Sequence, residues 1–476
     1  MTPTYTQDTP AWCDPCSAPR AQCGHPDPSS PGERHRGQAR IAYRLAAEYS
    51  GRLMYVRGLG WHVWDGARWA VDEKDQATTA VLEVLRRALA DSLTDHDLRT
   101  DVRRCESANG IAGVLSIASA LPALRAGTDE LDADPYLLNV ANGTLDLRTR
   151  QLRPHDPADR NTRVCTGAYA PEADARTWSD FLAAILPDPA ERAYLQRVIG
   201  QAVFGAVREH LFPVLTGTGA NGKGTAYGAI AHAMGDYATI IDPSLLMAHE
   251  RGSGGPEMMQ LFGARLVIGS ETEDGKQLDA ALMKRLTGGD QITARHLYQA
   301  PVTWTPSHQL VYVTNHLPKV KGNDPAVWRR VRVIPFDVVI PEGQRDSRLP
   351  EQLTLAADAV LTWAVQGWFD YEDQGGMGEP AAVQRATDGY QTDSDPVKRF
   401  TQDHCLTGPG YSALSRDLFA AWTRWAEADG TPRGSEKAFA ADLDRLGFEG
   451  RKTKLGKLRD GIGLPAEAPQ WGGGDG

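Results

Sequence analysis

A glycine-rich loop between a strand-like run and a helix-like segment constrains the fold of this chain most. The loop reads Gly217-Thr-Gly-Ala-Asn-Gly-Lys-Gly-Thr225, it follows residues 210–216, and it leads into residues 225–234. Glycines allow successive backbone N–H groups to turn inward around a phosphate, and a helix amino terminus adds positive potential. The sequence therefore predicts an α/β nucleotide domain whose phosphate contacts come from Gly217, Gly219, Asn221, Gly222, Lys223, Gly224 and Thr225.

One position departs from the usual loop. The Ser or Thr that ordinarily follows the lysine and holds Mg²⁺ is Gly224, and Thr225 supplies the nearest hydroxyl. We therefore expect Thr225 to take the place of the Mg²⁺ ligand. Some nucleoside monophosphate kinases also carry Gly-Lys-Gly-Thr, so the loop alone does not choose an enzyme class.

Two later strands are predicted to end beside the phosphates. The apolar run 265–270 is followed by Glu271 and Glu273, and the run 309–314 is followed by Asn315. Glu271 is expected to hold Mg²⁺ or polarise the attacking water, and Glu273 to share that task because alternate strand residues face the same side. An amide at Asn315 can orient the water and sense the γ-phosphate. The alternative is an acidic or Asn turn after a buried strand.

The same region contains two sets of candidate functional residues, a pair of arginines and a group of DNA-binding candidates. Arg329 and Arg330 are candidates for a guanidinium that reaches the nucleotide of a neighbouring subunit. A predicted hairpin near residues 291–304, together with the segment before it, offers contacts for a phosphate backbone and stacked bases. Its candidate DNA-binding residues are Lys284, Arg295, His296 and Tyr298. The simpler alternatives are a solvated basic cluster and a solvated hairpin tip.

Composition limits the class of protein. The 476 residues carry a net charge of −10, 41% hydrophobic residues and six cysteines. The acidic balance excludes a basic nucleic-acid coat but not a local DNA-binding surface. Because no apolar run approaches about 18 residues and no leader follows Met1, we expect a cytoplasmic chain with no membrane partner.

The chain is predicted to have six parts. These are a flexible arm (1–38), an α/β domain (39–200), the nucleotide domain (205–345), a helical linker (346–395), a C-terminal domain (396–465) and a disordered tail (466–476). The arm contains a set of residues that could form a Cys₃His zinc site, namely Cys13, Cys16, Cys23 and His25. A disordered arm with free cysteines is the alternative.

The order of these motifs resembles the superfamily 3 helicases, and among them the phage and plasmid primase–helicase branch related to the poxvirus primase–helicase. The matching motifs are 217–225, Ser270-Glu-Thr272, Leu286-Thr-Gly-Gly-Asp290 with Ala294-Arg295, Thr314-Asn-His-Leu-Pro318, Trp328-Arg-Arg330 with Ile334-Pro-Phe336, and Leu138–Leu147. The resemblance covers roughly residues 45–460.

This resemblance implies an AAA+-like P-loop ATPase core with an α/β domain before it and a winged-helix-like domain after it. It implies ATP and Mg²⁺ as cofactors, and an ATP-dependent DNA helicase of a mobile element. Such a helicase acts as a homo-hexameric ring that moves 3′–5′ on single-stranded and forked DNA. By position, Lys223 and Thr225 bind phosphate and Mg²⁺, Glu271 is the strand-end acid, Asn315 is the sensor, and Arg330 is favoured over Arg329 as the arginine finger.

A primase activity does not follow from the resemblance. Only about forty arm-like residues precede the first predicted domain, too few to fold a catalytic module. We therefore expect a primase, where one is needed, to be a separate protein.

The C-terminal residues favour DNA binding as well. Two helical patterns precede a basic stretch, which is a winged-helix order, and its cations are Arg451, Lys452, Lys454, Lys457 and Arg459. A solvated basic tail is the alternative. Two rival functions also stay open: a non-hydrolysing, nucleotide-switched origin-binding initiator or scaffold, which Gly224 favours, and a small-molecule kinase.

Overall fold

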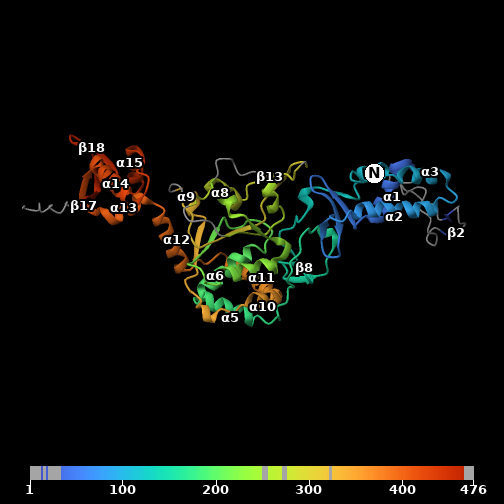
Figure 1. The fold of residues 1–476 in the computed structure, drawn as a ribbon, viewed down its shortest axis with the longest axis horizontal. Helices are drawn as coiled ribbons and strands as arrows, with labels where there is room; N and C mark the ends of the chain where they lie inside the picture. The colour runs from blue at the N-terminus through green and yellow to red at the C-terminus, as the bar shows by residue number, and fades with distance from the viewer. Residues whose placement is uncertain are drawn as a thin grey trace, which may run out of the picture.

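Three modules follow one another along the long axis of the molecule (Figure 1). The computed structural model describes residues 12–13, 18–19, 34–248, 256–270, 276–297, 299–320 and 324–465. The N-terminal module lies at one end, a central α/β body in the middle, and the C-terminal module at the other end, beyond α12 (Ala381–Asp393). The chain is thus a mixed α/β protein.

The N-terminal module packs four helices against a small sheet. The helices are α1 (Gly37–Tyr49), α2 (Gln76–Asp91), α3 (His96–Cys105) and α4 (Ala108–Ala118). The sheet has the order β5-β4-β3-β6, from β3 (Leu53–Val56), β4 (Gly60–Trp64), β5 (Trp69–Val71) and β6 (Arg125–Ala126). Ile41, Leu45 and Tyr49 recur every four residues along α1 and are buried, so one face of that helix forms the core.

A small antiparallel sheet lies between this module and the central body. It consists of β7 (Leu137–Val140), β8 (Gly143–Asp146) and β9 (Gln151–Arg153), and a turn at Asn142 joins β7 to β8. Leu138, Val140 and Leu145 belong to the core of the central body. The sheet is therefore packed as part of that body.

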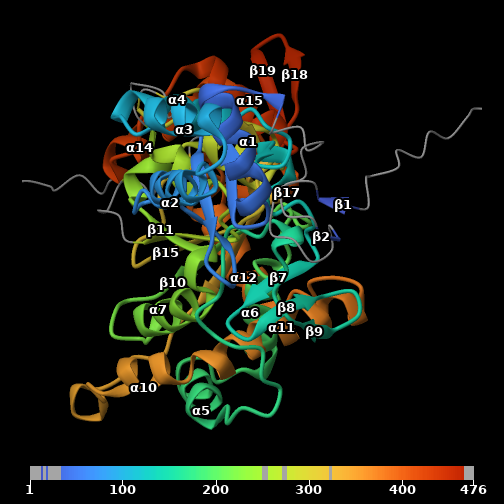
Figure 2. The ribbon, with the colours of Figure 1, turned by 90° about the vertical axis from the view of Figure 1, so that its right-hand side faces the viewer.

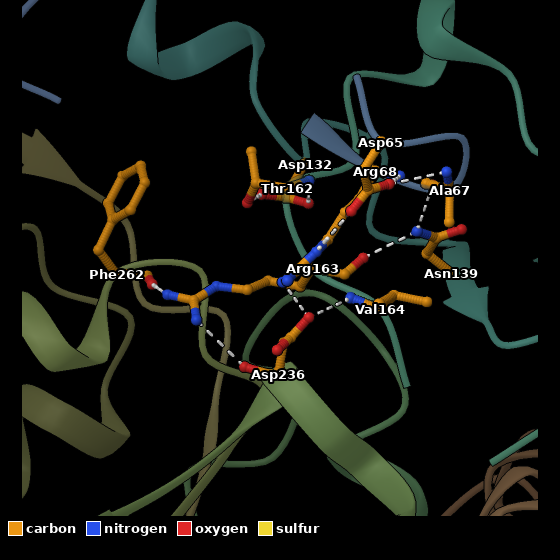
Figure 3. Close-up of polar contacts among 10 residues, drawn as sticks. All are labelled: Asp65, Ala67, Arg68, Asp132, Asn139, Thr162, Arg163, Val164, Asp236 and Phe262. Atoms are coloured by element: carbon orange, nitrogen blue, oxygen red, sulfur yellow. Dashed lines mark hydrogen bonds and ion pairs between the residues drawn. The ribbon is translucent and has the colours of Figure 1, made fainter. Parts of the chain in front are cut away.

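A polar network joins the N-terminal sheet to the central body (Figure 3). Arg68, in the β4–β5 turn region, forms an ion pair with Asp236 of the central body. Asn139 is fully buried, and its side-chain amide donates to the backbone oxygens of Ala67 and Arg163, at 2.9 Å each. Arg163 in turn donates to the backbone oxygens of Asp236 at 3.3 Å and Phe262 at 2.8 Å. These contacts fix the two parts to each other.

The central body is built on a parallel five-stranded sheet of order β11-β12-β15-β10-β16. Its strands are β10 (Phe212–Thr216), β11 (Ala238–Ile241), β12 (Leu266–Ser270), β15 (Gln309–Thr314) and β16 (Val331–Pro335). Successive residues point to opposite faces. Leu266 and Ile268 therefore enter one apolar cluster while Val267 enters another, so both faces of the sheet are covered.

Helices cover the two faces of this sheet. The first cluster takes in α5 (Arg176–Ile185), α6 (Pro189–Gln201), α7 (Lys223–Met234) and α11 (Ala357–Gln374). The second takes in α8 (Ala280–Thr287), the short α9 (Pro325–Trp328), and the hairpin of β13 (Ile292–Ala294) and β14 (Val302–Trp304). The short α10 (Leu349–Leu355) completes the body.

Two expectations from the sequence need correction here. The segment 346–395 is helical but α11 is not a linker, because Val360, Leu361 and Trp368 are buried in the central core. Pro187 separates α5 from α6, and Asp188 caps α6 by accepting a hydrogen bond from the backbone N–H of Ala190. α5 and α6 also pack in the central core rather than in the preceding domain.

The C-terminal module alternates helices and strands. Its elements are α13 (Pro396–His404), β17 (Leu406–Leu414), α14 (Ser415–Asp429), α15 (Glu436–Arg445), β18 (Gly450–Thr453) and β19 (Gly456–Gly463). The antiparallel sheet has the order β17-β19-β18. Phe400, Trp422 and Phe439 pack from the three helices into a separate small core.

The remaining described residues add two observations. The two-residue strands β1 (Trp12–Cys13) and β2 (Ala18–Pro19) pair with each other. Among the helices that the structure describes, none combines the length and apolarity needed to cross a bilayer.

Candidate nucleotide site and nucleic-acid surfaces

The glycine-rich loop joins the carboxyl end of β10 to the amino end of α7. Gly219 and Gly222 have φ values of +98° and +77°, which favour glycine. A Cβ at Gly217 would lie 2.4 Å from the backbone oxygen of Phe336, and one at Gly222 would lie 2.6 Å from Ile185 Cγ2. The loop therefore needs glycine for its backbone path and for its close contacts.

Lys223 is the first residue of α7 and is almost fully buried, with 4% of its surface exposed. Its ammonium donates to the backbone oxygen of Gly217 at 2.9 Å and to the side-chain oxygens of Asn221 and Asn315 at 3.1 Å each. Asn221 is itself fixed, since its amide donates to the backbone oxygen of Phe336 at 3.2 Å. The structure thus brings Lys223, Asn221 and Asn315 together at one point.

Three strands deliver their last residues to this edge of the sheet. Thr216 pairs with Thr314, and Ser270 pairs with Val313, so the residues that follow β10, β12 and β15 start from one level. Thr314 turns the chain there by donating its hydroxyl to the backbone oxygen of His316 at 2.7 Å. Glu271 and Glu273, the predicted acids, lie outside the described residues.

Gly224 stands where a Ser or Thr usually follows the lysine, and there is open space around it. Gly224 is exposed, and a Cβ built on it would meet nothing closer than Tyr227 Cε1 at 4.0 Å. The glycine is therefore not required by packing. Thr225 is half-buried and is one of the residues that line the cavity beside the loop. Thr225 stays a prediction as the hydroxyl ligand of a metal.

A cavity of about 590 Å³ adjoins the loop. Its walls come from α5, from the loop itself, and from the segment after β16, with Phe181, Ile185, Ala220, Ile340 and Leu349 among the lining residues. The backbone N–H of Ile340 donates to the backbone oxygen of Ala220 at 2.8 Å, which ties the third wall to the loop. Polar and charged residues complete the lining, among them Asp180, Arg345 and Asp346.

Arg329 and Arg330, the two candidates for the arginine finger, lie at the amino end of the strands, whereas the glycine-rich loop lies at the carboxyl end. They precede β16, whose first residue pairs with Phe212 at the amino end of β10, whereas Lys223 follows the carboxyl end. The five residues of β10 separate the two edges by about 16 Å. Neither arginine can therefore reach the phosphates bound by its own chain.

Burial distinguishes the two arginines and reverses their order. Arg330 is 6% exposed, its guanidinium donates to the backbone oxygen of Ala326 at 2.7 Å, and burial, followed by the charge of Arg329, lowers its pKa. Arg329 is exposed. Only an exposed side chain can extend into a neighbouring subunit, so Arg329, which the sequence ranked second, is the better candidate.

The predicted hairpin is formed by β13 and β14, and the N-terminal module packs against one side of it. Arg295 and His296 are exposed in the loop between β13 and β14, while Tyr298 lies outside the described residues. The arm of β14 packs against the N-terminal module, since a Cβ at Gly58 would lie 2.8 Å from Val302 Cγ2. A cavity of about 910 Å³ lies between that module and the loop, with Arg68, His296 and Leu297 among its lining residues.

Lys284 pairs with an acidic side chain. Its ammonium lies 2.8 Å from Asp324, and the pair is about one-third exposed. Such a pair contributes little to stability, so a DNA contact of Lys284 stays a prediction.

The C-terminal cations are displayed on one hairpin. Arg451 and Lys452 lie on β18, Lys454 lies in the turn, and Lys457 lies on β19, and all four are exposed. Arg459, on the same strand, is instead fully buried. Of the predicted zinc ligands, Cys16, Cys23 and His25 lie outside the described residues, as does the side chain of Cys13. In the described part of the chain no metal-ligating cluster is present.

Two segments of the chain match known protein families. Residues 42–187 match the family described as D5 N terminal like, and residues 215–330 match a family of unknown function. The protein named "Putative helicase L207/L206" of Acanthamoeba polyphaga mimivirus is 28% identical over 63% of this chain and 34% of its own length. The protein named "Putative primase C962R" of African swine fever virus is 24% identical over 67% of this chain and 36% of its own length.

These matches are consistent with the primase–helicase branch that the order of the motifs resembles. The chain spans about a third of the length of these two relatives. Among solved structures, the apo C-terminal region of NrS-1 is similar over 87% of this chain and 96% of that chain, with a TM-score of 0.47 and 10% identity.

The apolar wall of the cavity beside the loop was not predicted from the sequence. Phe181 and Ile185 come from α5, which was assigned to the preceding domain, and Ile340 and Leu349 come from the segment after β16. A signal was present, because Val338-Val-Ile340 is an apolar run that follows the last strand of the predicted sheet. Only the fold places that run beside the loop.

Proposed function

We propose that this chain is the motor of an ATP-driven DNA helicase with an AAA+-like core. The observation that carries the proposal is the position of Lys223 at the carboxyl end of β10 in a parallel sheet of order β11-β12-β15-β10-β16, with Asn315 at the end of the adjacent strand. In this arrangement the loop strand lies between the sensor strand and the last strand of the sheet.

ATP would occupy the loop and the adjoining cavity. The backbone N–H groups of the loop and the Lys223 ammonium would hold the phosphates. The base would enter the 590 Å³ cavity between α5 and the segment after β16. Lys223 would then exchange its contact with Asn315 for the γ-phosphate, which frees the Asn315 amide to orient water. Mg²⁺ would be held by the Thr225 hydroxyl and Glu271, and it would neutralise charge on the β- and γ-phosphates.

The positions of the arginines support work as a ring. Arg329 lies at the sheet edge remote from its own loop and is exposed, so it would complete the site of a neighbouring subunit. Hydrolysis then depends on assembly, and a homo-hexamer is the state that we propose. Single-stranded and forked DNA are the proposed substrates, with 3′–5′ movement as the family resemblance implies.

ATP hydrolysis by purified wild-type protein and by Lys223→Ala, with and without single-stranded DNA, tests the proposal. We expect DNA to stimulate hydrolysis and Lys223→Ala to abolish it while assembly persists. Hydrolysis in neither condition, with ATP still bound, would favour the alternative of a nucleotide-switched initiator, which Gly224 supports. Stimulation by nucleosides rather than by DNA would indicate a small-molecule kinase.

A further inference from the structure

We propose that the C-terminal module holds duplex DNA through the β18–β19 hairpin and not through α15. In a module of this order, the helix before the hairpin is the element expected to enter the major groove. The inference rests on the DNA-binding part of the proposed function. It names the surface that contacts the duplex and the type of contact.

The exposed surface of α15 has little positive charge to offer a groove. The helix carries Glu436, Asp442 and Asp444 but only two cations, Lys437 and Arg445. The guanidinium of Arg445 is already engaged, at 2.7 Å from Asp395 and 3.1 Å from Asp442. Because Asp442 and Asp444 are also held in ion pairs, α15 offers a phosphate little positive charge beyond that of Lys437.

The carboxylate of Asp444 stays ionised near neutral pH. It accepts a hydrogen bond from Arg459 at 2.6 Å, and that bond is the main cause of its lowered pKa. This carboxylate pairs with Arg459 and lies 3.8 Å from Lys457, so the three groups add little positive charge to the end of α15.

The hairpin is more strongly positive. Lys452 and Lys457 are directly opposite each other across β18 and β19, an arrangement of like charges that destabilises a strand pair. Lys457 leans over Gly450 toward Asp444, 3.8 Å away. In the described residues no ion pair is formed by Lys452 or Lys454. A polyanion that spans these cations would relieve their repulsion.

Arg451 adds to this surface. It pairs with Asp460 at 2.6 Å, but both side chains are more than half exposed, so the pair contributes little to stability. Its guanidinium can exchange the carboxylate for a phosphate at small cost.

The tip of the hairpin is apolar. Leu455 occupies the two-residue turn beside Lys454 and is 75% exposed, so its side chain is accessible to a partner. Proteins that bind the minor groove place apolar side chains against sugars and base edges, with cations on the flanking phosphates. Leu455 between Lys454 and Lys457 has that pattern.

A buried arginine holds the hairpin in place. Arg459 on β19 is fully buried and donates to Asp444, to the backbone oxygen of Ala440 at 2.8 Å, and to the Ser415 hydroxyl at 3.1 Å. The base of the hairpin is thus fixed to α14 and α15. Beyond that anchor the hairpin projects from its module (Figure 2).

Duplex binding by the full chain tests the proposal, measured as fluorescence anisotropy of a blunt 20-base-pair DNA over a range of salt concentrations. The double variant Lys452→Ala/Lys454→Ala should flatten the plot of log affinity against log salt by about two units. Wild type should therefore lose about tenfold more affinity than the variant between about 50 and 200 mM salt. Leu455→Ala should weaken binding about fivefold without changing the salt slope.

Lys437→Ala is the matched control, because it removes one exposed cation from α15. It should bind duplex DNA as wild type does. The proposal is overturned if Lys437→Ala weakens binding as much as the double variant, if the double variant keeps the wild-type slope, or if the wild type does not bind the duplex.

ATP hydrolysis of the same variants separates this proposal from the proposed function. Stimulation by single-stranded DNA should persist in Lys452→Ala/Lys454→Ala. Absence of ATP hydrolysis in the wild type would contradict the proposed motor function. An unchanged duplex affinity in the double variant would contradict only the hairpin contact.

Discussion

The ammonium of Lys223 lies 3.1 Å from the side-chain oxygen of Asn315, although 92 residues separate them in the chain. The contact joins the first turn of α7 to the end of the neighbouring strand β15. It means that the group expected to bind phosphate and the group expected to orient water share one hydrogen bond before nucleotide arrives. In the proposed mechanism, a bound nucleotide would break that bond, which would couple phosphate binding to release of the amide.

Removal of the Asn315 amide should therefore slow the chemical step more than it weakens binding. We expect Asn315→Ala to lower kcat for ATP by about 100-fold with a much smaller change in KM. Steady-state hydrolysis over a range of ATP concentrations measures both constants. His316→Ala is the matched control, since its side chain is exposed at the next position and should leave both constants unchanged.

A hydroxyl added to the loop should be tolerated. Gly224 has open space where a Cβ would lie, so Gly224→Ser should fold normally and lower the Mg²⁺ concentration that half-saturates hydrolysis. Gly222→Ala is the contrasting variant, because its Cβ would lie 2.6 Å from Ile185 at a φ of +77°. That change should disrupt the loop and lower the thermal midpoint. A Gly224→Ser protein with a raised Mg²⁺ requirement would contradict this reading of the loop.

The two finger candidates should fail in different ways. Arg329→Ala should retain ATP binding and thermal stability yet lose about 1,000-fold or more in kcat. Arg330→Ala should destabilise the fold by about 2 kcal/mol, because it leaves buried groups without their partner. Mixing Arg329→Ala subunits with Lys223→Ala subunits should restore some hydrolysis, since one interface then contains both groups. No recovery on mixing would argue against an arginine supplied by a neighbour.

His308 should make stability fall in mild acid. It is 3% exposed, neither ring nitrogen has a hydrogen-bond partner, and burial lowers its pKa to about 4. The unfolded chain takes up this proton near pH 6.5, whereas the folded chain does so only near pH 4. The contribution is constant above pH 6.5, and stability decreases by about 1.4 kcal/mol for each pH unit between those values.

Denaturant unfolding at several pH values checks this expectation. His308→Phe should remove the acid-dependent loss over that window, although the variant can differ from wild type in absolute stability. His210→Ala, which alters an exposed histidine, should retain the wild-type dependence.

The buried amide of Asn139 should hold the N-terminal module to the central body. Its four contacts are the backbone oxygens of Ala67 and Arg163, the Thr144 hydroxyl at 3.3 Å, and His155 Nδ1 at 2.8 Å. Asn139→Ala should cost about 2 kcal/mol or more of unfolding free energy, because it leaves buried oxygens without donors. Limited proteolysis should then cut faster between the two parts. Asn142→Ala removes two hydrogen bonds to the Tyr169 backbone at an exposed site, so it should change both measurements less than Asn139→Ala does.

Local chemistry made much of the nucleotide loop predictable from sequence. Glycines at 217, 219 and 222, followed by Lys223, dictate a backbone that only such residues can adopt at the start of a helix. The apolar strands before and after the loop were also recognisable, because a strand that is buried on both faces must be apolar throughout. The hairpin of Arg451 to Lys457 was recognisable from its charge.

Long-range packing decided what the sequence could not. Periodicity identified α11 as a helix but could not show that it packs on α6 and α7, so it was taken for a linker. Arg329 and Arg330 are neighbours of the same residue type, and only the turn before β16 buries one and exposes the other. The contact between Lys223 and Asn315 likewise depends on the fold, because 92 residues separate them in the chain. Side-chain chemistry is fixed by the sequence, whereas burial and partners depend on which distant segments the fold brings together.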